Sequence, residues 1–266
     1  KALCFLLKLH FMKTALFILL TFFSMQITNA QLKPVAYSDG NQKLNGFGVE
    51  AKSPTKNKPG ILILPAWKGI DTHSKEVAQQ LSDLNYSAFV ADIYGEGNYP
   101  TSTQEAGKQS GYYKSNFLEY QKRIQLALEQ LIKLGANPDQ IVVIGYCFGG
   151  TGALEAARAN MNVKGVVSFH GGLDRDVTRF VNTIIPQVLV LHGADDPYVS
   201  AASIVSFQNE MRNAKADWQM IYYADAVHAF TELSAGNDNS RGAAYNEKAD
   251  IRSWEHMKLF LMEVLQ

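Results

Sequence analysis

The feature that most constrains the fold is a strand followed at once by a glycine-rich turn and a helix start. The apolar run at 141–144 is typical of a buried β-strand, and Gly145-Tyr146-Cys147-Phe148-Gly149-Gly150 follows it directly. This spacing matches the G-x-S-x-G turn, whose central residue has a strained backbone and whose neighbours must be small. A cysteine replaces the serine here. The pattern predicts that Cys147 projects above a sheet edge at a helix N-terminus, where the helix dipole favours a thiolate.

The rest of the chain alternates apolar runs with amphipathic segments. A hairpin is expected around Ser38-Asp39-Gly40-Asn41, and residues 95–112, rich in Gly, Ser and Thr, predict a loop over the sheet. Further strands are expected at 61–64, 87–91, 164–169, 187–192 and 218–224, and helices at 71–84, 117–134, 148–159, 201–213 and 244–265. This alternation predicts an α/β fold, a mainly parallel sheet with helices on both faces. Such sheets carry their chemistry at the carboxyl ends of the strands.

The first thirty residues have the pattern of a signal peptide. Met12-Lys13 precedes an apolar run at 15–23, and small residues at Thr28 and Ala30 mark a cleavage site. Residues 1–11 are interpreted as upstream read-through and residues 31–266 as one domain. An uncleaved anchor is the alternative, but an apolar run of about nine residues is too short to span a bilayer. We expect an exported protein, periplasmic or secreted, without stable membrane insertion after cleavage.

Charge and motifs exclude several classes of partner. The net charge is zero, and residues 1–30 contribute three lysines and no acid, so the remaining chain is slightly acidic. A slightly acidic chain lacks the excess of positive charge that is typical of nucleic-acid-binding proteins. No HExxH, paired His/Cys spacing, dinucleotide loop or P-loop is present, so we predict no metal and no cofactor. The expected partner is a small-molecule acyl substrate.

The cysteine count supports a reactive role for Cys147. The chain has two cysteines, and Cys4 lies in the predicted signal peptide. The exported protein therefore keeps a single thiol, which an oxidising compartment would damage. Reactivity explains its position at the turn better than packing does, although a small buried hydrophobic residue is the alternative.

A thiol nucleophile usually needs a base and a group that orients the base. On this type of sheet the order along the chain is nucleophile, acid, histidine. Asp196 follows the strand at 187–192 and is the predicted acid, with Asp195 as the alternative and a simple turn before Pro197 as a third interpretation. His228 follows the next strand and is the predicted base.

Four other histidines compete with His228 for the role of base: His73, His170, His192 and His256. His170 follows the strand at 164–169 and could line a pocket, but it precedes Asp196 and so breaks the order. A core histidine is the more natural interpretation of that residue.

An acyl-transfer site also needs backbone donors for the oxyanion. One donor is expected at Phe148, directly after the nucleophile, and the other in the loop after the strand at 61–64, at the N–H of Trp67. The Trp67 side chain could also form an apolar wall of the pocket.

With these residues in place, the chain resembles the dienelactone hydrolase family of α/β-hydrolases, which use a Cys-Asp-His triad. The resemblance covers nearly all of residues 33–266. It rests on the turn at Cys147 together with Val35-Ala36-Tyr37-Ser38-Asp39-Gly40, Ala91-Asp92-Ile93-Tyr94-Gly95, Phe169-His170-Gly171-Gly172, His228-Ala229-Phe230 and Ala244-Tyr245-Asn246-Glu247. It implies Cys147 as nucleophile, Asp196 as orienter and His228 as base, with oxyanion donors at Trp67 and Phe148.

The sequence departs from the family pattern at three places. Ala66 replaces a glutamate that helps to activate the thiol in members that cleave dienelactones. Glu96 and Glu232 stand where those members carry arginines that bind the substrate carboxylate. Anions at these two positions would repel a carboxylate, so a dienelactone acid is not the expected substrate. Tyr94 and His170 complete the set of weaker candidates for substrate contacts, and a solvated loop charge is the alternative for both glutamates.

The sequence thus predicts an exported hydrolase of an ester, lactone or related acyl compound, acting through a thioester acyl-enzyme. A non-catalytic binding protein on a hydrolase scaffold is the alternative, and a redox-sensing thiol is a third hypothesis.

Overall fold

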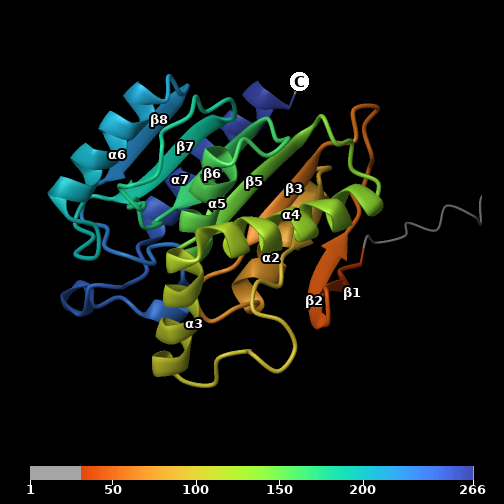
Figure 1. Ribbon diagram of the computed structural model, residues 1–266, viewed down its shortest axis with the longest axis horizontal. Coiled ribbons are helices and arrows are strands. Elements are labelled where there is room, and N and C mark those ends of the chain that lie inside the picture. Colours follow the sequence, from red (N-terminus) through yellow and green to blue (C-terminus); the bar gives the residue numbers. More distant parts are fainter. Residues whose placement is uncertain (1–30, 266) are drawn as a thin grey trace, which may run out of the picture.

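The computed structural model describes residues 31–265 and has one eight-stranded sheet at its centre (Figure 1). The strands are β1 (Lys33–Asp39), β2 (Gln42–Val49), β3 (Gly60–Leu64), β4 (Ser87–Val90), β5 (Ile141–Tyr146), β6 (Gly165–Phe169), β7 (Gln187–Gly193) and β8 (Trp218–Tyr223), in the order β1-β2-β4-β3-β5-β6-β7-β8. β1, β2 and β4 pair antiparallel, and every pairing from β4 to β8 is parallel. The predicted mainly parallel sheet is confirmed.

Helices cover both faces of the sheet, as the alternation of the sequence predicts. The helices are α2 (Thr72–Asp83), α3 (Thr103–Ser115), α4 (Phe117–Lys133), α5 (Phe148–Arg158), α6 (Ala201–Asn213) and α7 (Glu247–Val264), with short 3-10 turns at Leu233–Ala235 and Asn239–Arg241. α4, α5 and α6 share one apolar core, and α2 and α7 share the other.

The central strands divide their side chains between these two cores. Val143 of β5 faces the core under α4 and α5, whereas its neighbours Val142 and Ile144 face the core under α2 and α7. All three side chains are fully buried. This alternation explains why the strand is an unbroken apolar run, because a strand covered on both faces has no side open to solvent.

The hairpin predicted at the start of the domain is present, but the loop predicted at residues 95–112 is not. β1 and β2 form the expected hairpin, with Gly40 at a positive φ of 56° in the turn. The predicted loop is wrong, because α3 occupies most of that segment. The Ser102 hydroxyl accepts a hydrogen bond from the Glu105 N–H, and the Glu105 carboxylate accepts one from the Thr101 N–H. These caps offset the low helix propensity of the two glycines inside α3.

The expected signal peptide at 1–30 lies outside the described residues. Across residues 31–265, no helix combines the length and apolar character that crossing a membrane requires.

Candidate active site

Cys147 lies at the tip of the turn between β5 and α5. Its backbone has φ 53° and ψ −112°, a left-handed conformation that is rare outside glycine. Glycine is required two residues before and two residues after Cys147, because a Cβ at Gly145 would collide with the Gly149 carbonyl, and one at Gly149 with the Leu64 carbonyl. This close packing of β3, β5 and α5 holds the strained residue in place. The Cys147 side chain remains partly exposed.

His228 and Asp196 complete a chain of three side chains. The His228 Nε2 atom lies 3.0 Å from the Cys147 Sγ atom, and the His228 Nδ1 atom lies 2.8 Å from the Asp196 Oδ2 atom. Asp196 follows β7, and its other carboxylate oxygen accepts a hydrogen bond from the Tyr198 N–H at 2.9 Å. The loop after β8 carries His228, and its backbone pairs with Ala243 in an isolated bridge. Three separate strand ends therefore meet at one point.

The protonation of His228 follows from these contacts. Burial would lower the pKa of this imidazole, but its hydrogen bonds to Asp196 and Cys147 outweigh burial and raise the pKa of His228 to about 10. At neutral pH the ring is therefore an imidazolium, hydrogen-bonded on one side to a carboxylate and on the other to the sulfur.

The other candidates for base and acid lie elsewhere. His170 is fully buried, and its Nε2 atom lies 2.8 Å from the Thr231 hydroxyl. Burial lowers the pKa values of His73, His170 and His192, which are therefore neutral at pH 7. His256 contacts the Tyr223 hydroxyl at 2.8 Å. Asp195 is exposed, whereas Asp196 is only 6% exposed. Among the described histidines, only His228 contacts the sulfur.

The predicted oxyanion residues both border Cys147. Phe148 begins α5, so its N–H has no acceptor within the helix. Trp67 lies in the loop after β3 and lines the same cavity. The carbonyl of each residue accepts a hydrogen bond from a buried tyrosine: Tyr94 donates to the Trp67 oxygen at 2.7 Å, and Tyr120 to the Phe148 oxygen at 2.9 Å. These bonds fix the orientation of the backbone at both positions.

A cavity of about 500 Å³ opens in front of the sulfur. It is lined by Ala66, Trp67, Lys68, Asp71, Ser110, Lys114, Cys147, Phe148, Gly172, Tyr198, Val199, His228, Ala229, Glu232, Ser234, Ala235 and Ala243. The volume suits a small organic substrate. In the described part of the chain, no three His, Cys, Asp or Glu side chains converge as a metal site would require.

The four weaker candidates for substrate contacts lie in different places. Glu232 lines the cavity. Glu96 does not, because hydrogen bonds join its backbone to Lys43 and Gln42 and leave its side chain exposed. Tyr94 is 2% exposed and reaches the site only through the Trp67 carbonyl. His170 lies behind His228, with the two rings edge to face at 5.3 Å. Of the four candidates, Glu232 lines the cavity, whereas Glu96, Tyr94 and His170 do not.

Sequence reasoning missed several cavity residues. Lys114 and Ser110 come from α3, which was not predicted because residues 95–112 are rich in Gly, Ser and Thr. The Tyr198 ring packs edge to face against His228 at 5.2 Å. Its place two residues after Asp196 is the only signal that could have marked it. Tyr120, which supports Phe148 from outside the cavity, lies in the first turn of the amphipathic helix α4, where nothing in the sequence distinguishes it from other core residues.

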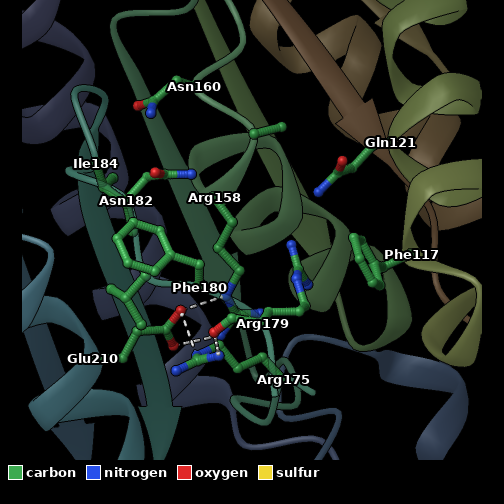
Figure 2. A pocket seen from close by; sticks show the side chains of 12 residues that line it. Phe117, Gln121, Arg158, Asn160, Arg175, Arg179, Phe180, Asn182, Ile184 and Glu210 are labelled. Carbon is green, nitrogen blue, oxygen red and sulfur yellow. Dashed lines mark hydrogen bonds and ion pairs between the residues drawn. The ribbon is translucent and has the colours of Figure 1, made fainter. Parts of the chain in front are cut away.

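A second cavity, of about 390 Å³, lies between α4, α5 and α6 and has a different character (Figure 2). Arg158 is bonded to both Glu155 and Glu210 within it, and Arg175 and Arg179 add further ion pairs. The cations there are paired with carboxylates of the same cluster. The arrangement is that of a structural ion-pair network.

The sheet, the strained turn and the strand-end residues define an α/β-hydrolase. The sequence profile of the dienelactone hydrolase family matches residues 44–265, so the chain belongs to that family and is a hydrolase. A solved dienelactone hydrolase-like promiscuous phosphotriesterase from metagenomic libraries is 32% identical, with a TM-score of 0.83 over 89% of this chain and 99% of that one. A solved structure named m3DLH is 30% identical, with a TM-score of 0.84 over 90% and 100%.

A relative from Bradyrhizobium, named as a probable 2-oxo-3-(5-oxofuran-2-ylidene)propanoate lactonase, is 26% identical over 217 residues. The match covers 78% of this chain and 84% of that protein. Such names support hydrolysis of a lactone or ester as the general activity.

Proposed function

We propose that this hydrolase cleaves esters or lactones with Cys147 as nucleophile, His228 as general acid and base, and Asp196 as orienter. The observation that carries the proposal is the pair of contacts at 3.0 Å and 2.8 Å that link the sulfur, the imidazole and the carboxylate. Both distances lie within the reach that proton transfer needs.

Acylation begins from a thiolate paired with the His228 imidazolium. The sulfur attacks the carbonyl carbon, and the resulting oxyanion accepts hydrogen bonds from the N–H groups of Trp67 and Phe148. As the C–O bond breaks, the imidazolium gives its Nε2 proton to the leaving oxygen. The products are an alcohol and a thioester on Cys147; a lactone keeps its alcohol within the acyl group.

Deacylation uses the same imidazole in the reverse direction. Neutral His228 takes a proton from water, the hydroxide attacks the thioester carbon, and the second oxyanion occupies the same two donors. The C–S bond then breaks, which releases the acid and restores the thiolate–imidazolium pair. Asp196 keeps the ring in the orientation and tautomer that both steps need.

A phosphotriester is the second candidate substrate. The observation that favours it is the 32% identity, over 89% of the chain, to the relative named as a promiscuous phosphotriesterase. The thiolate would attack phosphorus and form an S–P bond, and the imidazolium would give its Nε2 proton to the departing aryl oxygen as the P–O bond breaks. Water would then hydrolyse the S–P bond with His228 as base.

Purified protein should be assayed with p-nitrophenyl butyrate, γ-butyrolactone and a diethyl p-nitrophenyl phosphate, each beside the Cys147→Ala variant. We expect hydrolysis of the ester or lactone to disappear in that variant and a Cys147 acyl adduct of the intact protein to appear by mass spectrometry under rapid quenching. Full activity of Cys147→Ala would contradict the proposed nucleophile.

We also propose export of the protein, on the signal-peptide pattern of residues 1–30. Expression of residues 12–266 in a bacterial host tests this. We expect the exported form to begin at Gln31 by N-terminal sequencing, and a product found only in the cytoplasm with Met12 retained would contradict it.

A further inference from the structure

We propose that Glu232 selects the charge of the substrate: the cavity takes uncharged acyl groups, and Glu232 disfavours those that carry a carboxylate. This inference rests on the proposed ester hydrolysis at Cys147. It names the chemical class of acyl group that the same cavity accepts.

The position of Glu232 carries the first part of the argument. It lies four residues after His228 and lines the cavity that contains Cys147 and His228. The preceding residue, Thr231, is buried and bonded to His170, which fixes the backbone of this loop. The Glu232 side chain is only 13% exposed. A substrate in this cavity therefore shares a poorly solvated space with that carboxyl group.

The partners of Glu232 carry the second part. Its Oε1 atom is buried and has no hydrogen bond from any described residue. The nearest cationic candidate is His73 Nε2 at 3.8 Å, which is also buried and without a hydrogen-bond partner in that part of the chain. The separation is too long for a hydrogen bond. No described cation or hydrogen-bond donor thus neutralises this buried oxygen, and an ionised Glu232 acts on the adjoining cavity as an uncompensated charge.

The charged groups around Glu232 favour its neutral form. Asp71 also lines the cavity, and its carboxylate caps α2 by accepting a hydrogen bond from the Ser74 N–H at 2.8 Å. Asp250 of α7 adds a second carboxylate. Burial, and then these two acids, raise the pKa of Glu232 to about 7. The group therefore changes from a hydrogen-bond donor to an anion within the physiological range.

The other titratable groups nearby do not change charge over the same range. Burial lowers the pKa of His73 and that of His170, and burial raises the pKa of Tyr146, which ends β5 beside Glu232. The pKa of His228 is raised to about 10. Glu232 is thus a group of the cavity wall whose pKa is raised into the range between pH 6 and 8, whereas the pKa values of His73 and His170 are lowered.

Two cations also line the cavity and oppose this selection. Lys68 and Lys114 are both exposed residues, so solvent screens their attraction for an anion. Glu232 is poorly solvated, and its repulsion of an anionic acyl group is therefore stronger. Below pH 7 the neutral carboxyl group donates a hydrogen bond to an uncharged substrate; above pH 7 it repels a carboxylate.

The test compares two esters that share a leaving group and differ in one charge, p-nitrophenyl hexanoate and mono-p-nitrophenyl adipate. In the wild-type protein we expect the ratio of kcat/KM, hexanoate over adipate, to rise about tenfold from pH 6 to pH 8. In Glu232→Gln we expect the ratio to stay near its pH 6 value. Glu232→Asp should restore the pH dependence, and Glu129→Gln, an exposed position on α4, should match the wild type.

Either of two results would overturn the inference. One is a ratio that is independent of pH in the wild type or changes equally in Glu232→Gln. The other is a preference for adipate at pH 8, which would assign the selection to Lys68 and Lys114. Assays of Cys147→Ala with both esters distinguish this failure from failure of the proposed function. If hexanoate hydrolysis requires Cys147 but does not change in the Glu232 variants, only the charge selection is contradicted.

Discussion

At the scale of single residues, one backbone conformation determines the rest of the site. Cys147 is held at a positive φ because glycines on both sides let β3, β5 and α5 approach closely. That conformation directs the sulfur toward the cavity rather than into the core. The imidazole that contacts the sulfur comes from the loop after β8, where Ala229 also has a positive φ of 58°.

Replacing Asp196 and Asp195 in turn tests which of the two carboxylates orients His228. We expect Asp196→Asn to lower kcat for p-nitrophenyl butyrate by about 10²- to 10⁴-fold, because the amide no longer holds the productive tautomer of His228. The exposed Asp195 makes no such contact, so Asp195→Asn is the matched control and should remain within twofold of the wild type. Equal losses in the two variants would contradict the assignment.

The raised pKa of His228 predicts the alkaline limit of activity. The imidazolium that protonates an alkyl leaving group is present below its pKa and is lost as pH rises through about 10. For ethyl butyrate, kcat/KM should therefore hold to about pH 9 and fall above pH 10. In Asp196→Asn the falling limb should move toward neutral pH, because the largest favourable contact of the imidazolium is gone. A limb that does not move would show that another group titrates there.

At the scale of elements, the turn at Cys147 is supported from two directions. Tyr94, in the segment after β4, and Tyr120, on α4, each donate to a carbonyl next to a proposed oxyanion donor. Their rings stack on the Phe148 ring, at centroid distances of 5.8 Å and 4.5 Å. Phe148 is thus clamped by aromatic packing as well as by a hydrogen bond.

Removing either hydroxyl should loosen the oxyanion donors without disturbing the triad. We expect Tyr94→Phe and Tyr120→Phe each to lower kcat by about 2- to 10-fold, the equivalent of one neutral hydrogen bond, with KM unchanged. Tyr222→Phe, at a half-exposed position on β8, is the control. A rise in KM with unchanged kcat would assign the tyrosines to substrate binding instead.

The same elements explain what the sequence could predict. The central strands can be predicted from the sequence because burial on both faces makes them continuous apolar runs. The turn at Cys147 can be predicted because only glycine fits two residues before and two residues after it. Asp196 and His228 follow from the chain order. α3 was missed because capping at Ser102 outweighs its glycines, and the Tyr120 contact was missed because a hydrogen bond across 28 residues leaves no local pattern.

At the scale of the whole molecule, the segment between β6 and β7 is attached to the helical layer by buried charge. Arg158 on α5 contacts Glu210 of α6 at 2.8 Å (Figure 2). It also contacts Glu155 at 3.0 Å and donates a hydrogen bond to the Leu173 carbonyl at 2.9 Å. Arg179 of that segment lies over the Phe117 ring at 3.6 Å. α4, α5, α6 and the segment therefore share one network.

Truncating the central cation should destabilise the fold far more than removal of a surface charge. Arg158→Ala removes two hydrogen bonds from the buried Glu210 carboxylate and one from the buried Glu155 carboxylate, so we expect the free energy of unfolding to fall by about 3–5 kcal/mol in urea denaturation. Arg252→Ala, at an exposed position on α7, should change it by less than about 0.5 kcal/mol. The effect should also be global, because the network joins three helices: fluorescence and circular dichroism should report one shifted transition. A loss below about 1 kcal/mol, or unfolding of the segment alone before the main transition, would show that the ion pairs fasten only a local loop.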